Sequence, residues 1–213
     1  MFTFLFLLMT ALLATASDAN PFFVIPKNSW GKTVDEKACK PHTIQHISIH
    51  HTATPSTNNR KTPSRIRGYQ RYHQSKGWMD IAYHFLIDLE GNIYQGRNIE
   101  CAGDTATNYD PTGHLLIVME GNFEQQQPTP KALRSLAQLM TWGSHTYTVA
   151  PTQFFQHRDL AKTKCPGKHL SALLASDEFT KQLAVIHHTK FTLKLLSVEE
   201  GKDKITHIKS NGK

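Results

Sequence analysis

The chain of 213 residues is long enough for one domain with its own hydrophobic core. A hydrophobic content of 39% and a charged content of 19% are typical of a globular protein. The net charge of +7 either favours an anionic polymer or surface as partner or only keeps the protein in solution. Because no nucleic-acid-binding motif is present, we expect no nucleic-acid partner.

The first residues have the pattern of a signal peptide. Residues 1–16 are apolar almost throughout and end in Ala14-Thr15-Ala16, which polar residues follow. This stretch is short for a membrane span and resembles a cleaved secretory signal, although no Lys or Arg precedes it. An uncleaved anchor and a buried helix are the alternatives. We expect a secreted or periplasmic protein with no transmembrane segment in the mature chain.

In chain order, residues 17–41 predict an extended lead-in. Residues 44–52 predict a strand in which Ile49 faces one side and His50 the other, because side chains alternate along a strand. A helix is expected from Thr62 to the Lys76-Gly77 pair. Further predicted elements are a hairpin of residues 82–88 and 93–95, and a long loop over residues 98–113.

The second half predicts a central strand and two more helices. Residues 115–119 form an uninterrupted apolar run, typical of a strand buried on both faces. One helix is expected from Thr129-Pro130, an extended segment over residues 148–156, and a last helix over residues 170–186. Residues 187–213 are Lys-rich, and we expect a loosely attached tail. Helices interleaved with strands indicate an α/β fold, a single domain with a central mixed β-sheet flanked by helices.

Two histidines and a cysteine form a candidate metal group. His157 and Cys165 lie in one short loop that a Pro-Gly pair closes, and His50 ends the first strand. Two imidazoles and a thiolate are ligands that zinc selects, and three protein ligands leave an open position, as in catalytic sites. His51 points to the opposite face and is the weaker candidate. The alternative is a pair of surface histidines and a buried thiol.

The cysteine count is odd. The chain holds three cysteines, and an odd count in an exported protein indicates a free thiol or a metal ligand. If Cys165 binds metal, Cys39 and Cys101 remain as a candidate disulfide. The sequence leaves open whether they come within bridging distance.

Five separated motifs occur in the order and spacing of one family. They are Ile49-His50-His51-Thr52, Gly77 to Phe85, Gly91 to Arg97, Glu120-Gly121-Asn122-Phe123, and His157 to Gly167. Over residues 42–174 the chain resembles the N-acetylmuramoyl-L-alanine amidases of the peptidoglycan recognition protein type, which include amidase-type phage lysozymes.

The resemblance implies a zinc-bearing groove on a mixed sheet, in a zinc amidase domain over residues 42–186. It implies hydrolysis of the amide between the lactyl group of N-acetylmuramic acid and L-alanine. The expected ligands of one Zn²⁺ are His50, His157 and Cys165. The expected partners are peptidoglycan or muropeptides, bound by a monomer.

The resemblance also implies roles around the metal. Tyr83 matches the catalytic tyrosine, whose phenol can stabilise a developing oxyanion. Thr163 falls where relatives carry Thr or Lys and is the second catalytic candidate. Arg97, Asn108 and Tyr109 lie where the groove would meet substrate.

Two acidic residues have competing roles. Glu120 is interpreted as structural rather than catalytic. Asp159 either orients a ligand or caps the loop.

Two other functions fit the same residues. One is a non-catalytic peptidoglycan-binding module, against which the retained Cys165 argues. The other is a zinc peptidase acting within the stem peptide, since a fold does not fix which bond is cleaved.

Overall fold

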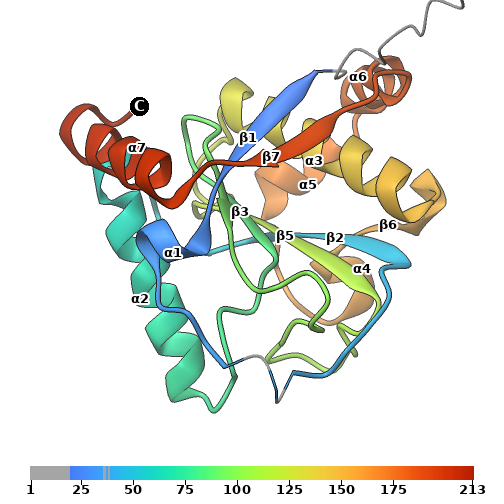
Figure 1. The fold of residues 1–213 in the computed structure, drawn as a ribbon. Helices are drawn as coiled ribbons and strands as arrows, with labels where there is room; N and C mark the ends of the chain where they lie inside the picture. Colours follow the sequence, from blue (N-terminus) through green and yellow to red (C-terminus); the bar gives the residue numbers. More distant parts are fainter. Residues whose placement is uncertain (1–19, 36, 38) are drawn as a thin grey trace, which may run out of the picture.

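Figure 1 shows the computed structural model, which describes residues 20–213 except residues 36 and 38. In this part of the chain, one seven-stranded mixed sheet carries helices on both faces. The predicted α/β fold with a central mixed sheet is therefore confirmed. The predicted signal peptide over residues 1–16 lies outside the described residues.

The sheet is parallel except at one hairpin. Across the sheet the strands are β6 (Phe154–Gln156), β2 (His46–His51), β5 (His114–Met119), β3 (Phe85–Ile87), β4 (Ile93–Gln95), β1 (Pro21–Ile25) and β7 (Thr192–Leu195). Only β3 and β4 pair antiparallel, as the predicted hairpin. β6 and β7 are the two edges.

Helices pack on both faces of the sheet. One face carries α3 (Pro130–Tyr147), α5 (Lys168–Leu174) and α6 (Asp177–His187), and the other carries α1 (Lys27–Trp30), α2 (Thr62–Ser75) and α7 (Val198–Asn211). The short pieces are η2 (Asn59–Lys61), η3 (Pro151–Gln153) and α4 (His157–Leu160). None of the helices in the described part of the chain is long and apolar enough to cross a membrane.

β5 is the central strand that the apolar run predicted. Leu115 and Ile117 pack in the cluster beneath α3, whereas Val118 packs in the cluster beneath α2 and α7. All three side chains are fully buried. Burial of each such side chain contributes about 1.5–3 kcal/mol. Because its side chains enter both clusters, β5 joins the two halves of the core.

The α3 start is as predicted, but the last predicted helix is interrupted. The Thr129 side chain accepts a hydrogen bond from Ala132 N–H, with Pro130 at the first helical position. The single helix expected over residues 170–186 is wrong, because α5 ends before Ser176. The Ser176 hydroxyl accepts from Phe179 N–H and caps a separate helix, α6.

The tail is not loosely attached, and that expectation is wrong. β7 pairs in parallel with β1, and α7 begins with a capping box between Ser197 and Glu200. Ile205 and Ile208 are buried against the side of the sheet that carries α1 and α2. Two isoleucines one turn apart are enough to dock a helix whose other faces are polar.

The lead-in is also more structured than an extended segment. It contains β1 and α1, and Lys27 of α1 forms a buried ion pair with Asp80. Trp30 is 1% exposed and donates from its indole N–H to Gln95 O at 3.0 Å. These contacts fix the lead-in to the hairpin and to the segment before Tyr83.

Candidate metal centre and groove

His50, His157 and Cys165 come together in the structure. One donor atom from each lies within 4.8 Å of the others. The two imidazole rings are 4.6 Å apart, and Cys165 Sγ lies 3.8 Å from His50 Nδ1. The sequence placed these residues in one group, and the fold brings all three to one point.

Parallel strands deliver the two histidines. His50 is near the end of β2 opposite Val118, on the face that carries α2. β6 runs parallel to β2 and ends one residue before His157, so the two histidines meet at the same end of the sheet. The Asp159 carboxylate accepts from Gln156 N–H at 2.7 Å and so caps α4, as one of the two alternatives for Asp159 proposed.

The cysteine loop is held by backbone contacts. Gly167 has φ +96°, and a Cβ there would lie 2.4 Å from the backbone carbon of Phe123, so only glycine fits. His51 N–H donates to Cys165 Sγ at 3.3 Å, while His51 Nδ1 accepts from Phe123 N–H. The His51 backbone therefore supports the thiol, while its ring holds the backbone of Phe123.

The three donors suit a cation. Burial lowers the pKa of His50 well below its ordinary value, so the ring is neutral and offers a lone pair. Burial raises the pKa of the Cys165 thiol to about 12, so the thiol needs a cation to become thiolate. Two imidazoles and one sulfur are a donor set that zinc prefers, and the group fits that metal.

Tyr83 lies beside this group. Its ring centroid is 5.3 Å from that of His50. Burial raises the pKa of the phenol above its usual value, so the hydroxyl keeps its proton. Among the described residues, no side chain or backbone atom forms a hydrogen bond with that hydroxyl, which leaves it able to donate to a bound molecule.

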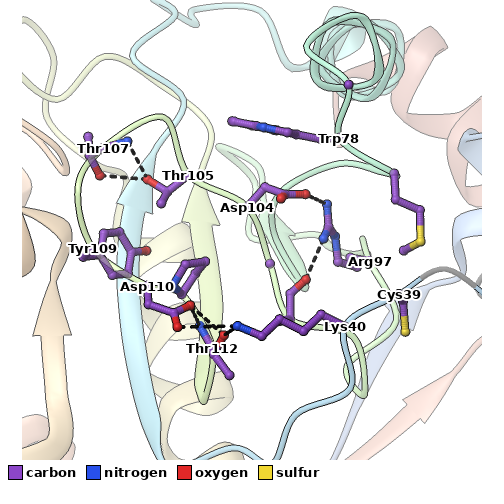
Figure 2. Close-up of a pocket in the computed structure, with 15 residues that line it drawn as sticks. Cys39, Lys40, Trp78, Arg97, Asp104, Thr105, Thr107, Tyr109, Asp110 and Thr112 are labelled. Atoms are coloured by element: carbon purple, nitrogen blue, oxygen red, sulfur yellow. Dashed lines mark hydrogen bonds and ion pairs between the residues drawn. The ribbon is translucent and has the colours of Figure 1, made fainter.

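A cavity of about 720 Å³ adjoins the group (Figure 2). Thr107 and Tyr109 line it, and their hydroxyls meet His157 and His50, so these two residues lie between the cavity and the histidines. The rest of its wall is mixed, with polar and charged side chains such as Lys40, Arg97, Asp104, Thr105 and Asp110 beside apolar ones such as Trp78. A polar, open cavity suits a hydrated substrate.

The three predicted substrate-binding residues differ in their positions. Tyr109 lines the cavity, with its ring 5.2 Å from that of His157. Arg97 also lines the cavity, but its guanidinium donates to Ile81 O and Ala102 O and pairs with Asp104. Asn108 is exposed and does not line the cavity.

Thr163 contacts the backbone of the cysteine loop. Its hydroxyl accepts from Cys165 N–H at 3.2 Å, and the side chain is half-buried. This contact orients the loop that carries the thiol. A catalytic role for Thr163 stays a prediction.

Glu120 has a structural setting, as interpreted. It is 1% exposed, forms an ion pair with Arg65 and accepts from the Thr62 hydroxyl. These bonds join the end of β5 to the first turn of α2.

Sequence reasoning missed Thr107. Its hydroxyl lies 2.7 Å from His157 Nε2, although fifty residues separate the two. One threonine among several in a long loop carries no pattern that marks such a contact.

Cys39 and Cys101 form a disulfide, with a Cα–Cα distance of 5.4 Å. This resolves the question that spacing left open, and Cys165 is the free thiol. The bond fastens the lead-in to the loop over residues 98–113, beside the cavity. Disulfides are typical of proteins in oxidising, extracellular surroundings.

The fold and the site together define a class. They are those of an α/β protein with three donor residues that could hold a metal ion, beside a groove with polar and charged side chains. Residues 40–168 match the Amidase_2 family, described as N-acetylmuramoyl-L-alanine amidase, and the chain belongs to this family.

Relatives include recognition proteins and amidases. Peptidoglycan recognition protein 1 of Mus musculus is 30% identical over 179 residues, which cover 82% of this chain and 97% of that protein. The N-acetylmuramoyl-L-alanine amidase LysC of Clostridium intestinale is 26% identical, with a TM-score of 0.59, covering 78% of this chain and 99% of its own. Peptidoglycan recognition protein LE, solved with tracheal cytotoxin, is 29% identical with a TM-score of 0.64, covering 73% and 95%.

Proposed function

We propose that the protein is an exported zinc-dependent N-acetylmuramoyl-L-alanine amidase, which hydrolyses the lactyl–L-alanine amide bond of peptidoglycan. The observation that carries the proposal is the group of His50, His157 and Cys165, whose donor atoms lie within 4.8 Å beside an open groove. These residues would hold one Zn²⁺. Membership of the amidase family supports the reaction.

When bound, zinc would act as a Lewis acid and bring the pKa of a water molecule near neutrality. Tyr83 would donate its hydroxyl proton in a hydrogen bond to the scissile carbonyl oxygen as negative charge develops there. A donor of this kind contributes about 3 kcal/mol to the transition state. Thr163 would hold the cysteine loop and add a second hydroxyl near the reaction.

The substrate would lie in the groove along Tyr109. Arg97 would support the wall through its bonds to Ala102 and Asp104, and Asn108 would meet the substrate at the rim. The partner is peptidoglycan or its muropeptide fragments, bound by a monomer.

Export is supported by two observations. Residues 1–16 have the pattern of a signal peptide, and the Cys39–Cys101 disulfide suits an oxidising compartment. A secreted or periplasmic location follows.

A non-catalytic recognition module is the second candidate, because several relatives carry the name of recognition proteins. Such a protein would keep the groove without turnover. The complete three-donor group favours the amidase over this alternative.

Purified protein incubated with muropeptides, with and without a chelator, tests the proposal by mass analysis of the products. We expect free glycan and intact stem peptide, with activity lost on chelation and in Cys165→Ser. Ser210→Ala, at an exposed position of α7 away from the metal group, is the control and should keep wild-type activity. Full activity in Cys165→Ser would contradict the metal assignment, binding without products would support the recognition module, and cleavage between two amino acids would indicate a peptidase.

A further inference from the structure

Two hydroxyl groups of the loop over residues 98–113 contact the metal-binding histidines. Thr107 Oγ1 lies 2.7 Å from Nε2 of His157, and the Tyr109 hydroxyl lies 3.4 Å from Nε2 of His50. In both rings the loop meets the same nitrogen. A histidine that binds metal through one nitrogen keeps a proton on the other, and this N–H needs an acceptor.

The other nitrogen of each ring is the one left for an ion. On His50 it is Nδ1, which lies 3.8 Å from Cys165 Sγ and so faces the third donor. On His157, Nε2 is occupied by Thr107, which leaves Nδ1 with its lone pair. In both rings, therefore, Nε2 faces the loop and Nδ1 is the nitrogen left for an ion.

We propose that Thr107 and Tyr109 are positioning residues of the metal centre: their oxygens accept the Nε2 protons of His157 and His50, so that both rings present Nδ1 to the ion. This rests on the proposed function only for the identity of the three ligands. In this role Thr107 and Tyr109 affect the ion only through the two histidines that they orient.

Thr107 can accept because its own hydroxyl proton has another acceptor. Thr105 Oγ1 lies 2.8 Å from Thr107 Oγ1, and the same oxygen also accepts from Thr107 N–H. Thr107 can thus donate to Thr105 while its lone pair receives the His157 proton. Figure 2 shows the two threonines together on the wall of the cavity.

The loop is fastened at both ends, which keeps the two hydroxyls in place. Near its start, Cys101 is tied to Cys39 by the disulfide. Across the loop, His42 Nε2 donates to Ile99 O and His42 Nδ1 accepts from Gly113 N–H, both at 2.9 Å. A site is more accurate when its supporting residues are themselves held by such bonds.

Zinc affinity of the full chain, measured by competition with a chromogenic chelator, tests the proposal. Thr107→Val and Tyr109→Phe each remove one hydroxyl at nearly constant size, and each should weaken zinc binding about 10–100-fold. Thr107→Ser keeps the hydroxyl and should bind zinc as wild type does. Thr112→Val is the matched control in the same loop, because Thr112 contacts Lys40 and Asp110 and should leave zinc affinity unchanged.

Long-range ¹H–¹⁵N NMR of the zinc-loaded protein supplies a second readout. We expect metal-bound Nδ1 and protonated Nε2 in both His50 and His157. Coordination through Nε2 of either ring would overturn the proposal, as would wild-type zinc affinity in both Thr107→Val and Tyr109→Phe. An equal loss of affinity in Thr107→Ser and Thr107→Val would also overturn it, because the hydroxyl would then not be the cause.

These measurements separate the two proposals, because zinc binding needs no turnover. A wild-type chain that binds zinc, loses affinity in the variants and hydrolyses no muropeptide would contradict the amidase and support the positioning role. An active chain whose variants bind zinc normally would contradict the positioning role alone. Absence of zinc binding by the wild type would contradict both.

Discussion

Tyr83 combines a protonated hydroxyl with a position beside the metal group. Burial holds its pKa above the usual range, and its ring is 5.3 Å from the ring of His50. A phenol in this setting donates a hydrogen bond and does not ionise near neutral pH. In the proposed hydrolysis its contribution would therefore fall in the transition state, where charge develops on the carbonyl oxygen.

Tyr83→Phe should lower kcat about 100-fold or more while zinc affinity stays at the wild-type value, because one oxyanion donor is lost and no ligand is touched. Steady-state hydrolysis of a muropeptide, together with chelator competition, measures both. Tyr72→Phe is the control, since Tyr72 is 57% exposed on the outer side of α2. Unchanged kcat in Tyr83→Phe would remove this residue from the mechanism.

Single residues were predictable where a local pattern marked them. Alternation along the strand separated His50 from His51, the family resemblance favoured His50, and the structure shows that His50 is the one that reaches His157. Lys27 could not be paired with Asp80, which lies 53 residues further along the chain. Such contacts depend on the assembled fold, and neither partner's sequence neighbourhood marks them.

The first and last elements of the described chain pack against each other. β1 and β7 pair in parallel, and α7 packs against α1 and α2. The Lys-rich composition did not indicate that α7 is packed against the fold, because its buried stripe is narrow and consists chiefly of Gly201, Ile205 and Ile208. By contrast, β5 and α3 were predictable from an unbroken apolar run and from a Thr-Pro start, signals that need no partner.

Ile208→Ala should destabilise the protein by about 2–5 kcal/mol, because Ile208 is fully buried and the change leaves a cavity between α7 and the sheet. Val198→Ala, at an exposed position of the same helix, should change stability by less than about 0.5 kcal/mol. Urea unfolding followed by circular dichroism compares the two. Equal small effects would mean that α7 does not contribute to the core.

The molecule as a whole depends on histidines that are neutral. Burial lowers the pKa of His84 to about 3, and that of His73 and His114 to about 4. His84 Nδ1 accepts from Leu116 N–H and His73 Nδ1 accepts from Ala82 N–H, bonds that a protonated nitrogen cannot accept. Protonation therefore opposes the fold at several places at once.

Stability of the metal-free protein should fall as pH drops below about 6.5, the ordinary pKa of histidine. Between that pH and about 4 the unfolded chain binds these protons and the folded chain does not, so each histidine costs up to about 1.4 kcal/mol per pH unit. Urea unfolding at pH 7 and pH 5 measures the loss. Equal stability at both pH values would contradict the neutral histidines.

The order of strands has a consequence for synthesis on the ribosome. Chains emerge from the amino end, and domains form as their parts become available. Val24 of β1 pairs with Ile93 of β4 and with Leu195 of β7, so its outer partner is the last of the seven described strands to be made. The strands β2 and β6, which deliver His50 and His157, emerge before β7. The side of the sheet that holds β1 is therefore completed only after the other strands have been made.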